Sequence, residues 1–167
     1  VSPISSLNYN IQLMMGNFVF ALTVLVGIVV IGLIMSKGAV SSNDVFLYTT
    51  NLAVFTLVAF SISYLIVLLV KSSNAFSAVT QIISLGLSFI SGACVPPVLL
   101  GEGVLKAASF TPSYWYIKAN ETIGALTSYQ YSDLVPIFQY ILIELAFAAA
   151  LIAIALVISK NRSYENA

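Results

Sequence analysis

Four long runs of apolar residues, separated by short polar segments, dominate the pattern of this chain. The runs cover about residues 13–35, 49–70, 75–95 and 134–159. Each is close to the roughly 20 apolar residues that an α-helix needs to cross the hydrocarbon core of a bilayer. Backbone polar groups in lipid have to be satisfied within the segment, so an α-helix is the expected form of each run. The pattern predicts an all-α integral membrane protein with four transmembrane helices, in one transmembrane domain over residues 13–167.

The residues before the first run show a weaker, amphipathic pattern. Within residues 1–12, apolar side chains recur at helical spacing from Ile4 to Ile11, and Ser2 offers an N-cap just before Pro3. This spacing predicts a short amphipathic helix at the membrane surface. A simple lead-in to the first transmembrane helix is an equally good interpretation.

The segment between the third and fourth runs, about residues 96–126, is too apolar for an ordinary loop and too interrupted to cross a bilayer. Its two consecutive prolines remove backbone donors, so we expect the third helix to end near Val95. Trp and Tyr collect at membrane boundaries, and an aromatic cluster follows the next proline. We predict a re-entrant or interfacial helical hairpin here. The residues on which it rests are Pro96, Pro97, Pro112, Tyr114 and Trp115.

Small residues in the third run define one candidate packing face. Ser84, Ser88 and Gly92 are spaced by four, which would let another backbone approach closely, and Gln81 lies on nearly the same face. Helix packing within one subunit is the leading interpretation. A contact face between two subunits and the lining of a transport path are the alternatives.

Glu144 is the only charged residue within the four predicted transmembrane helices. An ionisable side chain in hydrocarbon costs at least a few kcal/mol, so it should face protein or water, or be protonated. We expect either a buried polar contact that joins helices or a role in the substrate path or its gating. Gln81 is the second intramembrane polar candidate for such a path.

Composition excludes several classes of protein. Hydrophobic residues make up 60% of the chain and charged residues 7%, which leaves too few charges to cover a soluble domain. Basic and acidic residues cancel, so no positive face is available for nucleic acid. Histidine is absent and Cys94 is the only cysteine, so we predict no metal site, no catalytic dyad and no disulfide. Cys94 lies in an apolar run and should be a small packing residue.

The string GACVPPVLL from Gly92 to Leu100, followed by SFTPSYWY from Ser109 to Tyr116, resembles the last third of ABC-type-2 transporter permeases. These are the membrane subunits of ATP-driven exporters. The order of long apolar segments agrees with that family over essentially the whole chain. By this resemblance the chain begins just before the third of six helices and runs to the C-terminus, with the re-entrant pair between the fifth and sixth.

The resemblance implies a permease subunit, or a fragment of one, that moves substrate while a separate ABC ATPase subunit hydrolyses ATP. The chain itself would be no enzyme and would bind no cofactor, since it has no G-x-x-x-x-G-K-[ST] motif. A second permease subunit, identical or different, and membrane lipid would be its other partners. Basic residues divide equally between the two sides, so charge leaves the orientation open. The family implies the cell membrane and cytoplasmic termini.

Two groups of residues receive roles from the resemblance alone. The outward-facing hairpin, with Pro96, Pro97, Pro112, Tyr114 and Trp115, would help to close the outer end of the path. A coupling segment that touches the ATPase would include or adjoin Ser2, Pro3, Ile4 and Ser5. The alternative is a non-transporting accessory or immunity-type multi-pass membrane protein, which uses the same helices only to bind a partner.

Overall fold

The computed structural model describes residues 6–38, 40–70 and 72–165, and in these ranges the chain forms helices and turns without a β-strand. Four long helices are each apolar and long enough to cross a membrane. They are α1 (Ser6–Ser36), α2 (Ser42–Leu69), α3 (Ser73–Ile90) and α6 (Tyr131–Glu165). Three short helices lie between α3 and α6, namely η1 (Pro97–Leu99), α4 (Glu102–Ala108) and α5 (Pro112–Gly124). The predicted all-α membrane fold, with a helical hairpin before the last span, is confirmed.

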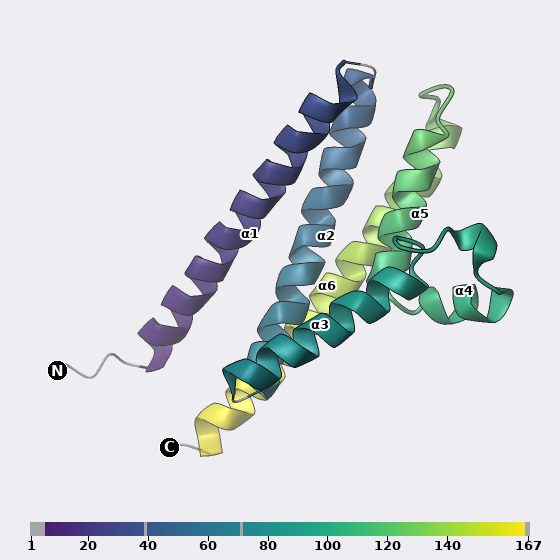
Figure 1. The fold of residues 1–167 in the computed structure, drawn as a ribbon. Helices are drawn as coiled ribbons and strands as arrows, with labels where there is room; N and C mark the ends of the chain where they lie inside the picture. Colours follow the sequence, from purple (N-terminus) through teal and green to yellow (C-terminus); the bar gives the residue numbers. More distant parts are fainter. Residues whose placement is uncertain (1–5, 39, 71, 166–167) are drawn as a thin grey trace.

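Helices α2, α5 and α6 pack together and form the centre of the bundle, while α1 lies along α2 and α3 contacts α2, α4 and α5. The loop that joins α1 to α2 and the loop that joins α5 to α6 lie at one end of the bundle (Figure 1). The first turn of α1 and the last turn of α6 lie at the other end (Figure 1). Helix α4 projects to the side of the bundle, and α5 folds back alongside α6 (Figure 1).

The core is small and lies where α2, α5 and α6 meet. Leu47 of α2, Ile123 of α5, and Ile137 and Ile141 of α6 form its buried cluster. The outward faces of the long helices remain apolar and exposed, as with Phe20 at 70%. In water such a surface would drive aggregation, but it is the surface that a bilayer requires.

One continuous helix occupies the N-terminal region where we predicted a surface helix followed by a span. Helix α1 begins at Ser6, and its apolar stretch begins at Met15. No proline or glycine interrupts the chain between Ser6 and Met15, so the backbone hydrogen bonds continue without a break. All four predicted coupling residues lie outside the described residues, namely Ser2, Pro3, Ile4 and Ser5.

The prediction that prolines end the third helix near Val95 is wrong. Helix α3 ends at Ile90, because Gly92 adopts a left-handed conformation with φ of 96° and turns the chain. A Cβ atom on Gly92 would lie 2.8 Å from Cγ of Pro97. Gly92 is therefore a turn residue and not a third member of a packing face. Cys94 lies in this turn and is exposed, so its predicted packing role is also wrong.

Polar contacts at one end of the bundle fix where α2 and α6 begin. Ser41 caps α2, which starts seven residues before the predicted Thr49, and α6 starts at Tyr131 instead of Leu134. Tyr129 donates its hydroxyl to Asp44 Oδ1 at 2.9 Å, and its oxygen lies 2.6 Å from that of Ser41. We call these three residues the Tyr129 latch, since they join the loop before α6 to the start of α2.

Candidate functional site: a polar seam and two cavities around α5

A fully buried asparagine joins α2 to α5. The Asn51 amide donates to the Tyr116 carbonyl oxygen at 3.1 Å and to Asn120 Oδ1 at 2.9 Å. Tyr116 and Asn120 are one turn apart on α5, so the same face of that helix presents both acceptors. The amide oxygen of Asn51 has no hydrogen-bond partner among the described residues. Sequence reasoning missed Asn51, although a lone asparagine in an apolar run was a visible signal.

Glu144 lies inside the protein, with no exposed surface. It follows Ile137 and Ile141 on the face of α6 that packs against α2 and α5. Within the part of the chain that the structure describes, neither carboxyl oxygen has a hydrogen-bond partner. The carboxyl group lies within electrostatic range of Tyr116. We refer to Asn51, Tyr116, Asn120 and Glu144 as the polar seam.

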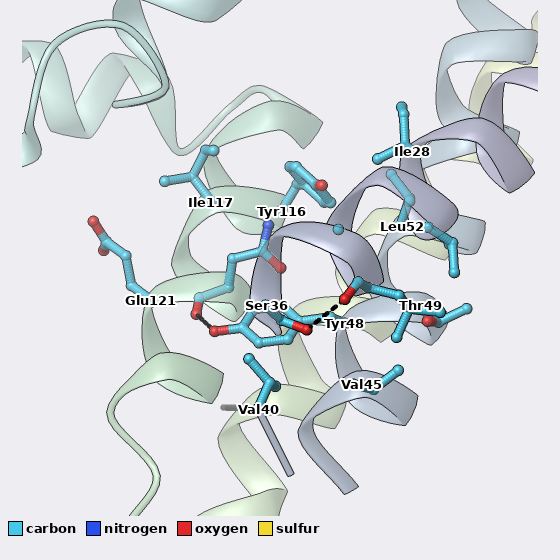
Figure 2. Close-up of a pocket in the computed structure, with 14 residues that line it drawn as sticks. Ile28, Ser36, Val40, Val45, Tyr48, Thr49, Leu52, Tyr116, Ile117 and Glu121 are labelled. Atoms are coloured by element: carbon cyan, nitrogen blue, oxygen red, sulfur yellow. Dashed lines mark hydrogen bonds between the residues drawn. The ribbon is translucent and has the colours of Figure 1, made fainter. Parts of the chain in front are cut away.

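A first cavity of about 480 Å³ lies between α1, α2 and α5. Its α1 wall is largely apolar and includes Ile28, while Tyr48 of α2 and Glu121 of α5 also line it. Figure 2 shows Tyr116 and Ile117 of α5 on one side and Ile28 of α1 on the other, while the Glu121 carboxylate points away from the other labelled side chains. The Tyr48 hydroxyl donates to the carbonyl oxygen of Asn120 at 3.5 Å. This cavity therefore borders the polar seam.

A second cavity of about 250 Å³ lies between α2, α3 and α5. Tyr116 and Ile117 line this cavity as well as the first, so α5 forms the wall between them. Most of its lining residues are apolar and none is charged; the polar ones are Tyr116 and a set of serine and threonine residues. The hydroxyl oxygens of Thr80 and Ser91 are buried, so they are not open to the cavity. The serine and threonine residues of the lining are Ser63, Thr80, Ser84, Ser88, Ser91 and Ser113.

An aromatic cluster holds α5 against α6 and surrounds a lysine. The Lys118 ammonium lies 5.4 Å from the ring centroid of Tyr114, 5.6 Å from that of Trp115 and 5.3 Å from that of Tyr140. Cation–π attraction at these distances contributes about 0.5–2 kcal/mol. The Trp115 indole donates to the Ser109 carbonyl oxygen at 2.9 Å, which closes the turn between α4 and α5. The Trp115 ring also lies 5.6 Å from the Tyr140 ring of α6, between centroids, so Trp115 contacts the bundle as well as closing the turn.

The other predicted site residues occupy separate places. Pro112 is buried in the first turn of α5, whereas Pro96 is exposed before η1. Ser84 and Ser88 line the second cavity, but Gln81 is exposed and contributes to neither cavity. Gln81 and Glu144 are therefore not brought to a common path. No group of three or more potential metal ligands occurs among the described residues.

Comparison of the chain with protein-family models, with curated proteins and with solved structures finds no match. A fold of this kind hosts many activities, so function has to be argued from the site. The polar seam and the two cavities beside it are the features of this chain that bear on its function.

Proposed function

We propose that this chain is the membrane-spanning part of an ATP-driven ABC exporter, a permease subunit or a portion of one. The observation that carries the proposal is Glu144, a carboxyl group buried in the core of a membrane-embedded bundle, with no partner for either oxygen among the described residues. An ionisable residue inside a membrane protein is a functional candidate by default, because it is costly to keep there.

Structural need alone does not account for Glu144. Replacement of a buried ion pair by apolar residues of similar size is often neutral or stabilising by about 1–4 kcal/mol, and a buried carboxyl group without a partner has less still to lose. A leucine would therefore serve packing between α2, α5 and α6 at least as well. In our proposal the carboxyl group contacts a polar substrate, exchanges a proton or contacts a moving helix during transport.

The cavities on the two sides of α5 support a transport role. Helix α5 is short, packs against α2 and α6, and separates the two cavities with Tyr116 and Ile117. A small movement of α5 would enlarge one cavity and reduce the other. In our proposal this movement accompanies passage of substrate, and the hairpin residues Pro96, Pro97, Pro112, Tyr114 and Trp115 help to close the outer end.

ATP hydrolysis is assigned to a separate ABC ATPase subunit, because the sequence contains no phosphate-binding loop of the Walker type. We further propose a second permease subunit beside this one, a location in the cell membrane and cytoplasmic termini. The sequence resemblance to ABC-type-2 permeases and the helical pair before the last span support this assignment.

The test is to isolate the tagged natural protein from its own membranes into nanodiscs and to measure subunit composition and ATP hydrolysis. We expect a stoichiometric ATPase subunit with a Walker motif. Glu144→Gln should lower hydrolysis by the complex at least tenfold while the ratio of subunits stays the same. The matched control is Glu102→Gln, since Glu102 is an exposed carboxylate on α4. Absence of an ATPase subunit, or equal hydrolysis by both variants, would refute the proposal.

A further inference from the structure

Lys118 places a positive charge against a membrane-spanning helix without a matching negative charge. Its ammonium group lies 5.3 Å from the ring centroid of Tyr140, which belongs to the apolar stretch of α6. Lys118 forms no ion pair with any of the described residues. The nearest acidic residue along α5 is Glu121, which lines the first cavity. An ionisable side chain at this depth is costly, so an unpaired lysine indicates a counter-charge from outside the chain.

The protein itself holds this ammonium group only weakly. The ring centroids of Tyr114, Trp115 and Tyr140 lie 5.3–5.6 Å from it, close to the roughly 6 Å limit of cation–π attraction. Its hydrogen bond to the Tyr114 hydroxyl oxygen is 3.4 Å long, whereas charged N–H donors typically reach about 2.7–2.9 Å. The remaining N–H donors of the ammonium group have no acceptor in the described part of the chain.

The aromatic cluster around Lys118 is open to a ligand, because none of its members is fully buried. Tyr114, Trp115, Lys118 and Tyr140 each keep part of their surface accessible. Tyr140 also carries a hydroxyl group that bonds to none of the described residues and can donate to an acceptor. Aromatic faces alone would favour a cation, but the charge of Lys118 repels one. The combination therefore favours an anion that is attached to an apolar group.

We propose that Lys118 and the rings of Tyr114, Trp115 and Tyr140 bind the phosphate group of an amphiphile. Lysine binds phosphate as a point charge, so its ammonium group supplies the missing pairing without a fixed geometry. The Tyr140 hydroxyl donates a second hydrogen bond, and the aromatic faces contact the start of the apolar chain. The site requires only α5 and α6 and does not depend on ATP-driven export. Its failure and the failure of the proposed function are therefore separate results.

Trp115 is the only tryptophan in the chain, so tryptophan fluorescence reports directly on this cluster. The probe is decyl phosphate, titrated into the purified full chain in dodecyl maltoside micelles, which contain no phosphate. Decanol and decyltrimethylammonium share its tail and differ in head charge. We expect a saturable change in Trp115 emission at a concentration of decyl phosphate at least tenfold below that of decanol, and no change with decyltrimethylammonium. Equal titration by the three compounds, or no saturable change with decyl phosphate, would overturn the proposal.

Variants at the lysine locate the site. Lys118→Met keeps the length of the side chain and removes its charge, so it should weaken binding of decyl phosphate at least tenfold. Lys118→Arg keeps the charge and should bind within about threefold of the natural protein. The matched control is Lys106→Met, which removes an exposed lysine from α4 and should leave binding unchanged. Undiminished binding by Lys118→Met, or an equal loss in Lys106→Met, would contradict the proposal. The charge preference of the natural protein tests it without any variant.

A final arm distinguishes a bilayer lipid from a soluble anion. Inorganic phosphate is titrated alone, and the anionic phospholipid that stays with the purified protein is quantified by mass spectrometry. Retention by the natural protein, with loss in Lys118→Met, identifies the membrane as the source. A saturable response to inorganic phosphate without retained lipid identifies a soluble phosphate compound. Both results support the site, and equal retention by the two proteins without a response to inorganic phosphate opposes it.

Discussion

Replacement of Gly92 by alanine should destabilise the protein through two separate effects in the turn after α3. The first is conformational, because φ of 96° lies in a region that side chains other than glycine rarely adopt. The second is steric, because the new Cβ would lie 2.8 Å from Cγ of Pro97 and 3.2 Å from its Cδ. Both atoms belong to a rigid ring, so the backbone of the turn has to shift.

The magnitude follows from these two contributions. A left-handed conformation costs a non-glycine residue roughly 1–2 kcal/mol. Relief of the contact with Pro97 adds about 1 kcal/mol, typical of the strain from a single added methyl group. We expect a total loss of about 2–3 kcal/mol from the free energy of unfolding. This is a large share of the roughly 5–15 kcal/mol that stabilises a typical domain.

The assay is equilibrium unfolding of the purified variants in mixed micelles, followed by circular dichroism. Gly86→Ala is the matched control, because Gly86 lies inside α3 and a Cβ atom added there would meet nothing within 4 Å beyond the backbone of its own helix. It should stabilise the protein by up to about 1 kcal/mol through helix propensity. In the double variant Gly92→Ala/Pro97→Ala, the steric contribution to the loss of unfolding free energy should disappear, and the conformational contribution should remain.

Equal stability of Gly92→Ala and Gly86→Ala would refute this reasoning. It would mean that α3 continues as a helix through Gly92, as the sequence pattern first indicated. If Gly92→Ala/Pro97→Ala is as unstable as Gly92→Ala alone, only the steric part of the reasoning is refuted.

Three further predictions concern the ends and the centre of the bundle. Tyr129→Phe removes the hydroxyl of the Tyr129 latch and should lower the free energy of unfolding by about 1 kcal/mol, whereas Tyr131→Phe, at an exposed position, should change it by less than about 0.5 kcal/mol. Glu144→Leu should leave stability unchanged or raise it by about 1–4 kcal/mol in the same unfolding assay, and a clear loss would show that the carboxyl group is structural. In the proposed orientation, and in a cysteine-free background, cysteine at Ser42 should react with an impermeant thiol reagent added outside the cell and cysteine at Ser73 should not; the reverse pattern would place the termini outside.

Hydropathy predicted the four long helices because bilayer thickness sets their length and lipid excludes unpaired backbone groups. The helix ends were harder, since they depend on local geometry that composition conceals. The end of α3 is set by the backbone angle of Gly92, and the start of α2 by the Ser41 cap. The two prolines gave the stronger signal in the sequence, but the glycine a few residues earlier is where the helix ends.

The sequence predicted a site residue only where a charged or polar side chain stands within an apolar run. Glu144 was evident as a charge in an apolar run, but its neighbours were not. The partners of Asn51 are more than 60 positions away, on a helix whose return into the bundle no local pattern specifies. Ser91 looked like one serine among many, and only the folded chain reveals that its hydroxyl group has no partner among the described residues.

The shared wall between the two cavities has a thermodynamic consequence. Tyr116 and Ile117 line both cavities, so a ligand that displaces α5 from one side changes the affinity of the other for its own ligand. Linkage makes this influence reciprocal, with one coupling free energy for both directions. An occupant of the second cavity would then act as an effector of whatever enters the first, and the two could be titrated against each other as a pair.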